Sequence, residues 1–142
     1  MGSRLGAIVA ILLLGAAPAT GATLTVKIAG IRSDRGSIYC ELFARPDGYP
    51  KDASQAAQTQ KVAIHQRAAS CLFEGVTPGT YAVAAYHDEN GNGKLDTNFL
   101  GIPSEGVAAS NDAKGTMGPP SFEKAKLAVT GAELGITIHL SY

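Results

Sequence analysis

The side chains best suited to chemistry are oxygen-bearing ones that alternate along a glycine-rich stretch, residues 87–96. They stand at positions 1, 3, 5 and 9 of a loop and are Asp88, Asn90, Asn92 and Asp96. Gly93 is the sixth residue, where a calcium loop turns sharply, and Lys94 is the seventh, which offers its backbone carbonyl. Because Ca²⁺ takes about six to eight oxygen ligands, this spacing predicts a calcium site.

Two features separate this stretch from an EF-hand. The twelfth residue is Phe99, which cannot supply the bidentate carboxylate, and residues 80–86 before the loop have the pattern of a strand. Glu105 is the candidate for the missing carboxylate, because the Gly-Ile-Pro sequence of residues 101–103 can fold the chain back. With so few charged ligands, we expect weak binding, with a Kd of about 10⁻⁴–10⁻³ M. The alternative is a metal-free loop of Asx-turns and left-handed turns.

Other catalytic or metal-binding patterns are weaker. The three histidines lie on or next to three different predicted strands, whereas zinc requires three or four converging ligands. His87 adjoins the loop and could hydrogen-bond a carboxylate there, and the alternative is a surface histidine at the end of a strand. No nucleophile elbow or Ser-His-Asp arrangement occurs. Asp88, Asp96 and Glu105 could form an acid pair of the kind that glycosidases use, although an ion loop uses the same residues more simply. We therefore expect no enzyme, with a carboxylate-dependent enzyme acting on an envelope glycan as an alternative.

The N-terminus has the features of a secretory signal peptide over residues 1–22. Arg4 precedes an apolar run over residues 5–14, and small-x-small cleavage sites end at Ala19 and Ala22. A membrane anchor is the alternative, but the run is shorter than the ~20 residues that span a bilayer. We expect a periplasmic or extracellular protein with no membrane insertion after cleavage.

Charge and cysteine content agree with an exported single domain over residues 23–142. Basic and acidic residues both number 12, so the formal net charge is zero and nothing favours nucleic acid as a partner. Cys40 and Cys71 are the only cysteines, and export would place them in an oxidising compartment. We predict a Cys40–Cys71 disulfide, which by the chain-entropy argument stabilises the fold by roughly 3–4 kcal/mol. Two buried free thiols are the alternative.

The rest of the sequence predicts an all-β fold. Short alternating segments indicate seven strands, at residues 23–28, 37–43, 61–65, 70–73, 80–86, 122–129 and 134–142. The first two are expected to pair as a hairpin, with Leu24, Val26 and Ile28 on the buried face of the first. Apolar residues on both faces of residues 80–86 indicate a central strand. The connection over residues 88–120 is long and aperiodic, which is typical of functional loops. We predict a seven-stranded antiparallel sandwich, immunoglobulin-like or prealbumin-like in outline, with one long loop.

Four motifs occur in order along the chain, beginning with the Thr-Pro-Gly-Thr-Tyr sequence of residues 77–81 and the loop of residues 87–96. Gly-Ile-Pro-Ser-Glu-Gly follows at residues 101–106 and Gly-Pro-Pro-Ser-Phe at residues 118–122. Together they resemble the secreted bacterial proteins grouped as domain of unknown function 2141, over nearly all of the chain after the signal. That resemblance implies the fold and the exported location, and it implies no activity.

Three functional hypotheses follow. The leading one is an exported, non-enzymatic binding or structural module whose loop binds Ca²⁺ weakly, with an envelope or extracellular protein or glycan as a possible partner. The second is the carboxylate-dependent enzyme on an envelope glycan. The third is an interaction domain whose long loop binds a protein without metal.

Overall fold

The computed structural model describes residues 21–142, so the predicted signal peptide lies almost entirely outside the described residues. The elements in chain order are β1 (Ala22–Ala29), β2 (Ser37–Phe43), the 3₁₀ turn η1 (Ala53–Gln55), β3 (Gln58–Ala63), β4 (Ala69–Val76), β5 (Gly79–Asp88), β6 (Val107–Ala109), the 3₁₀ turn η2 (Ser110–Asp112), α1 (Phe122–Ala125), β7 (Leu127–Val129) and β8 (Glu133–His139). Within this part of the chain, no helix is long and apolar enough to cross a membrane.

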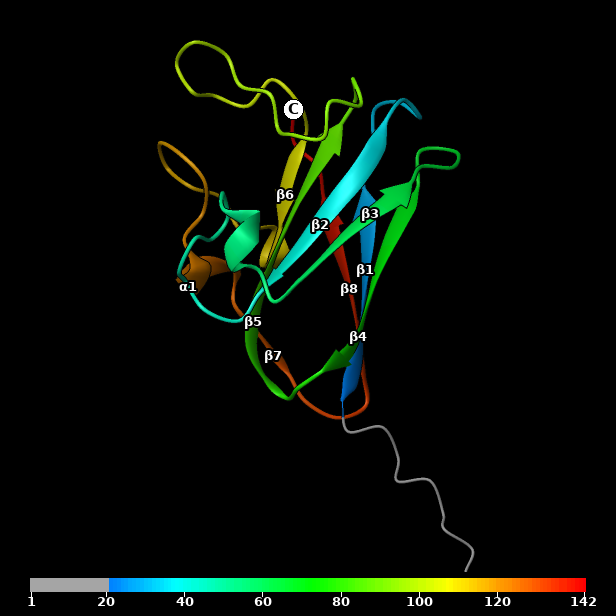
Figure 1. The fold of residues 1–142 in the computed structure, drawn as a ribbon, viewed down its shortest axis with the longest axis vertical. Helices are drawn as coiled ribbons and strands as arrows, with labels where there is room; N and C mark the ends of the chain where they lie inside the picture. Colours follow the sequence, from blue (N-terminus) through cyan, green and yellow to red (C-terminus); the bar gives the residue numbers. More distant parts are fainter. Residues whose placement is uncertain (1–20) are drawn as a thin grey trace, which may run out of the picture.

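The strands form two facing sheets, as the sequence predicted (Figure 1). The smaller sheet has the order β4-β1-β8, and the larger has the order β3-β2-β5-β6, with β7 pairing with the first residues of β5. The long strand β5 is central, which its apolar residues on both faces indicated. It ends at Asp88, so the predicted metal loop begins where the central strand leaves the sheet.

Three details of the predicted topology are wrong. The described chain has eight strands instead of seven, because the short strand β6 forms within the segment expected to be one long loop. The sandwich is not wholly antiparallel, because β1 and β8 run parallel, with Val26 opposite Ile136. β1 and β2 do not form a hairpin, since they belong to different sheets. A three-residue strand has no visible period, and alternation along a strand does not specify its partner.

The core lies between the sheets and is closed by a disulfide. Leu24, Val26 and Ile28 alternate along β1 and are buried, which places the face predicted to be apolar inside. Cys40 on β2 and Cys71 on β4 are bonded, so the bridge joins the two sheets across the core. The predicted pairing is confirmed, and the disulfide loop includes β3 and the turn before β4.

A second, smaller cluster covers the outer face of the larger sheet. The Tyr49 ring meets Phe43 and Phe122 edge-on, at centroid distances of 5.2 and 5.8 Å. The buried Ser110 hydroxyl accepts a 2.9 Å hydrogen bond from the N–H of Val83 and donates to the carbonyl of Ala125. This hydroxyl therefore ties the end of β6 to β5 and α1.

One carboxyl group on that outer face is buried without an ion pair. Glu41 on β2 is 8% exposed, and no Lys, Arg or His of residues 21–142 forms an ion pair with it. Burial, with a smaller contribution from the charge of Asp52, raises the pKa of Glu41 to about 7. The charged form of Glu41 is thus disfavoured by the folded state.

Candidate functional site

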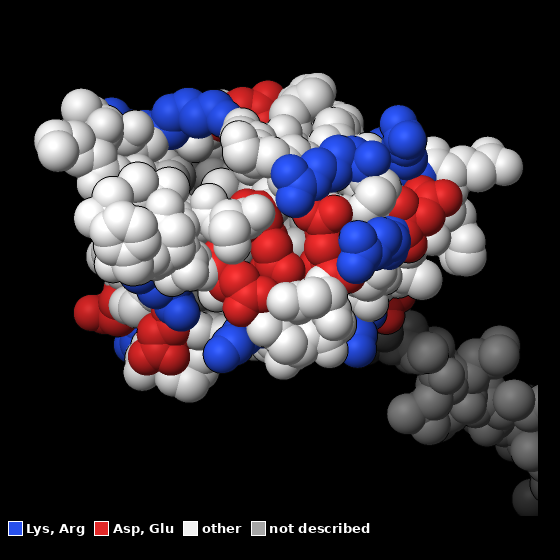
Figure 2. Space-filling view, turned by 90° about the horizontal axis from the view of Figure 1, so that it is seen from above, with Lys and Arg blue, Asp and Glu red and all other residues white. Residues whose placement is uncertain are grey.

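The predicted metal loop lies at one end of the sandwich, beyond the last residue of β5. Figure 2 looks onto this end and shows Asp and Glu side chains gathered near its middle, with Lys and Arg side chains beside them. The connection between β1 and β2 packs against the start of the loop. A Cβ atom on Gly36 would lie 1.8 Å from the carbonyl oxygen of Asp88, so only glycine permits this approach.

Asp88 folds the first half of the loop around its own carboxylate. It is 1% exposed, and its two oxygens accept hydrogen bonds from the backbone N–H groups of Asn92, at 3.2 Å, and Gly93, at 2.8 Å. Gly93 has a φ of +79°, as the predicted sharp turn requires. The carboxylate therefore lies inside the concave side of the turn, where the first ligand of a cation loop is expected.

The two asparagines and Asp96 meet one another within the loop. The side-chain amide of Asn90 donates to the Asp96 carboxylate at 2.6 Å, and that of Asn92 donates to it at 2.8 and 3.0 Å. Hydrogen bonds from Asn92 and Asn90 lower the pKa of Asp96, so this carboxylate is charged at neutral pH. Rotating each carboxamide by half a turn would replace the nitrogen with an oxygen at the same place.

Glu105 returns to the loop, as the Gly-Ile-Pro sequence predicted. Its carboxylate is 6% exposed and accepts one hydrogen bond from the N–H of Glu89 and one from the N–H of Asp96, each at 3.1 Å. Glu105 thus bridges the two ends of the loop. Of the five predicted side chains, Asn90, Asn92 and Asp96 contact one another, and the carboxylates of Asp88 and Glu105 accept hydrogen bonds from the backbone of the same loop. Phe99 points away from them and is 95% exposed.

Three carboxylates of the loop, those of Asp88, Asp96 and Glu105, form no ion pair within residues 21–142. Lys94 is exposed and acts on Asp96 only through its charge. Over the same residues, no three His, Cys, Asp or Glu side chains form a group that could hold a metal. Asp88, Asp96 and Glu105 are side chains of these types, so their carboxylates do not form such a group in this structure. The predicted ligand set depends in addition on Asn90, Asn92 and the backbone carbonyl of Lys94.

Two supporting contacts could not be identified from the sequence. Glu89 accepts a 2.7 Å hydrogen bond from Nε of Arg32 and one of 3.1 Å from Ser33. The bond from Arg32 is the main reason that the pKa of Glu89 is lowered. This ion pair holds the loop against the connection between β1 and β2. Glu89 stands at an outward position of the cation pattern, so the pattern assigned it no role.

The second supporting contact is made by His87, which hydrogen-bonds to Arg35 and Tyr142. It is fully buried, whereas the sequence offered a surface histidine or a partner for a loop carboxylate. Its Nε2 lies 2.6 Å from the carbonyl oxygen of Arg35, which can only accept, so Nε2 carries the proton. Its Nδ1 therefore accepts from the Tyr142 hydroxyl, at 2.8 Å. His87 holds Tyr142 beside the loop and makes no hydrogen bond to a carboxylate of residues 21–142.

Two hollows in the surface lie away from the loop. One is lined by Thr25, Lys27 and residues 135–137 of β1 and β8, and a shallower one by the ends of β1 and β4 with His65. Neither is lined by a residue of the loop. The carboxylates of the loop are thus surrounded mainly by backbone and carboxamide groups.

The fold and the loop together define a disulfide-linked β-sandwich with a carboxylate-rich turn at one end. A family model described as uncharacterized protein conserved in bacteria (DUF2141) matches residues 26–137, and the chain belongs to this family. The resemblance drawn from the four motifs is therefore confirmed. No curated protein and no solved structure matches the chain, so its likeness to immunoglobulin or prealbumin domains stays a prediction.

Proposed function

We propose that this protein is an exported, non-enzymatic binding module whose loop over residues 88–105 binds one Ca²⁺ ion. The observation that carries the proposal is that two almost fully buried carboxylates, Asp88 and Glu105, and the Asp96 carboxylate belong to one loop, and that none of them forms an ion pair with a cationic side chain of residues 21–142. Buried negative charge is unfavourable unless hydrogen bonds or a cation compensate it. A bound calcium ion would supply that compensation.

The ligands would be the side-chain oxygens of Asp88, Asn90, Asn92 and Asp96, together with the backbone carbonyl of Lys94. Glu105 would complete the set, either directly or through a water molecule. Binding requires the two carboxamides to turn their oxygens inward, which releases their hydrogen bonds to Asp96. The loss of these hydrogen bonds reduces the free energy gained on calcium binding. This reduction agrees with a Kd of about 10⁻⁴–10⁻³ M, the range of extracellular calcium modules.

Thermal melting in calcium and in chelator tests the proposal. With a Kd of about 0.1 mM, 1 mM calcium stabilises the fold by roughly 1.4 kcal/mol. For a domain of this size, the melting temperature then rises by about 5 °C. We expect Asp88→Asn to abolish the shift, because it removes the first charge and keeps one hydrogen-bond acceptor. Lys94→Ala is the matched control, since the backbone carbonyl remains. A shift in Asp88→Asn equal to that of the wild type would refute this ligand set.

The same hydrogen bonds favour a second candidate, a metal-free loop that binds a protein partner. The amide groups of Asn90 and Asn92 already close the loop on Asp96, and Glu105 already spans its ends. In that case, calcium and chelator give identical melting curves. Asn92→Ala would then lower stability by about 1 kcal/mol in both, because the loss is that of a hydrogen bond.

A further inference from the structure

The segment after the metal loop forms a fixed turn with apolar side chains at its tip. Asn98 holds this turn, because its side-chain oxygen accepts hydrogen bonds from the N–H groups of Leu100, at 2.9 Å, and Ile102, at 3.0 Å. Its backbone N–H also donates to the carbonyl of Ile102, at 2.8 Å. Phe99, Leu100 and Ile102, hereafter the apolar tip, are 95%, 68% and 56% exposed.

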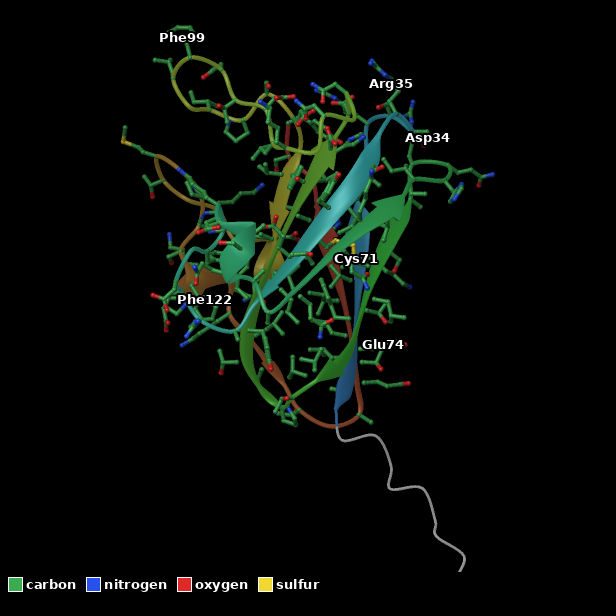
Figure 3. The ribbon with its side chains drawn as sticks, in the orientation of Figure 1. Asp34, Arg35, Cys71, Glu74, Phe99 and Phe122 are labelled. Carbon is green, nitrogen blue, oxygen red and sulfur yellow. A yellow bond between two sulfur atoms is a disulfide. The ribbon has the colours of Figure 1, made fainter. Side chains whose placement is uncertain are left out.

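The size and shape of the apolar tip suit insertion into a lipid layer better than docking onto a protein surface. It protrudes from one end of the sandwich, and Phe99 stands at its outermost part (Figure 3). From these exposed fractions, the tip offers about 400 Å² of apolar surface. A stable protein interface or dimer needs about 800 Å² from each partner. A small convex tip of this kind can instead bury its whole surface in a deformable layer.

Cationic side chains accompany the tip at the same end. Arg35, Arg67 and Lys94, hereafter the cationic rim, are exposed, and none forms an ion pair with a residue in the range 21–142. Arg35 lies at the same end of the sandwich as Phe99 (Figure 3). Arg67 belongs to the adjoining β-turn, where its N–H donates to Asp34 at 2.6 Å. Exposed cations at the end of the sandwich that carries the apolar tip can contact the anionic headgroups of a bilayer, and the Asp and Glu side chains near the middle of this end oppose that attraction.

We propose that this end of the sandwich attaches to anionic lipid bilayers. Phe99 and Leu100 enter the boundary between headgroups and acyl chains, about 5–10 Å deep, and the cationic rim contacts lipid phosphates. The turn is already fixed by Asn98, so little conformational freedom is lost on insertion. This attachment is separate from the proposed calcium binding, because the apolar tip and the arginines take no part in the ligand set.

A single tryptophan at the tip makes insertion visible. The sequence contains no Trp, so Phe99→Trp introduces a single tryptophan, whose emission can be excited selectively over that of the five tyrosines. The protein after signal removal is mixed with vesicles of phosphatidylglycerol and phosphatidylcholine, in chelator, since divalent cations would bridge carboxylates and phosphates. We expect the emission to shift to shorter wavelength with phosphatidylglycerol and to be quenched by acyl chains brominated near the headgroup. Emission that does not change with any vesicle would overturn the proposal.

Co-sedimentation of the wild type and its variants with vesicles separates the contribution of the apolar tip to binding from that of the cationic rim. Phe99→Ser with Leu100→Ser should weaken binding at least tenfold, because two side chains lose their apolar burial. Arg35→Gln and Arg67→Gln should each weaken it about fivefold and reduce its dependence on salt. The matched controls are Leu72→Ser, at an exposed position on β4, and Lys27→Gln on β1, and both should bind as the wild type does. Variants of the tip that still sediment like the wild type would refute insertion. A dimer dissociated by Phe99→Ser, without vesicle binding, would assign the tip to a second copy instead.

Discussion

Replacing Glu41 by Gln should stabilise the protein at pH 8 much more than at pH 5. The folded state raises the pKa of Glu41 from 4.5 to about 7, so folding favours the protonated form. The contribution of Glu41 to stability is therefore fully present below about pH 4.5 and is lost as the pH rises through about 7. Gln keeps the size of the side chain and cannot ionise, so the contribution of this position to stability does not change over this range.

The magnitude follows from the same shift. A pKa raised from 4.5 to about 7 corresponds to at most about 3.4 kcal/mol of lost stability well above pH 7. The carboxylate keeps some contact with water, and screening reduces the effect, so we expect about 1–2 kcal/mol between pH 5 and pH 8. Other titrating groups are the same in both proteins and cancel in the difference between them.

Urea unfolding of the wild type and Glu41→Gln at the two pH values measures this difference. Glu133→Gln on β8 is the control, because Glu133 is exposed and its removal should change stability equally at both pH values. An equal effect of Glu41→Gln at pH 5 and pH 8 would refute the raised pKa of Glu41 in the folded state.

Three further predictions concern the chain outside the loop. Intact-mass measurement should find the Cys40–Cys71 bond in the exported protein. Reduction of this bond should lower the free energy of unfolding by roughly 3–4 kcal/mol. Two thiols that alkylate without reductant would contradict the prediction. Gln66 and Arg67 both have positive φ in the turn before β4. The double variant Gln66→Asn with Arg67→Gly should therefore raise the free energy of unfolding by about 1–2 kcal/mol, measured by urea unfolding. An unchanged free energy of unfolding would show that the turn is unstrained. Ala22 is fully buried and lies opposite Val76 in the sheet. N-terminal sequencing should therefore find cleavage after Ala19 and not after Ala22. An exported protein that begins at Met1 would indicate a membrane anchor.

The sequence predicted those parts of the fold that local patterns specify. Alternation along residues 23–28 identified the buried face of β1, and apolar residues on both faces of residues 80–86 identified a central strand. The single cysteine pair left only one possible bond. The parallel pairing of β1 with β8 could not be predicted, because the two strands are far apart in the chain and no local sequence pattern specifies that they pair.

The candidate site shows the same division. The spacing of Asp88 and Gly93 predicted the turn, and the Gly-Ile-Pro sequence predicted the return of Glu105. The role of Ser110 was not predictable, since a buried serine hydroxyl is identified only by the backbone groups around it. The ion pair between Glu89 and Arg32 depends on two loops that meet only in the folded chain.

Calorimetric titration of the protein after signal removal with CaCl₂ tests the central claim most directly. The account predicts one binding site with a Kd of about 10⁻⁴–10⁻³ M, and no binding heat for Asp88→Asn under the same conditions. Absence of heat in the wild type, together with identical melting in millimolar calcium and in chelator, would contradict calcium binding by this loop.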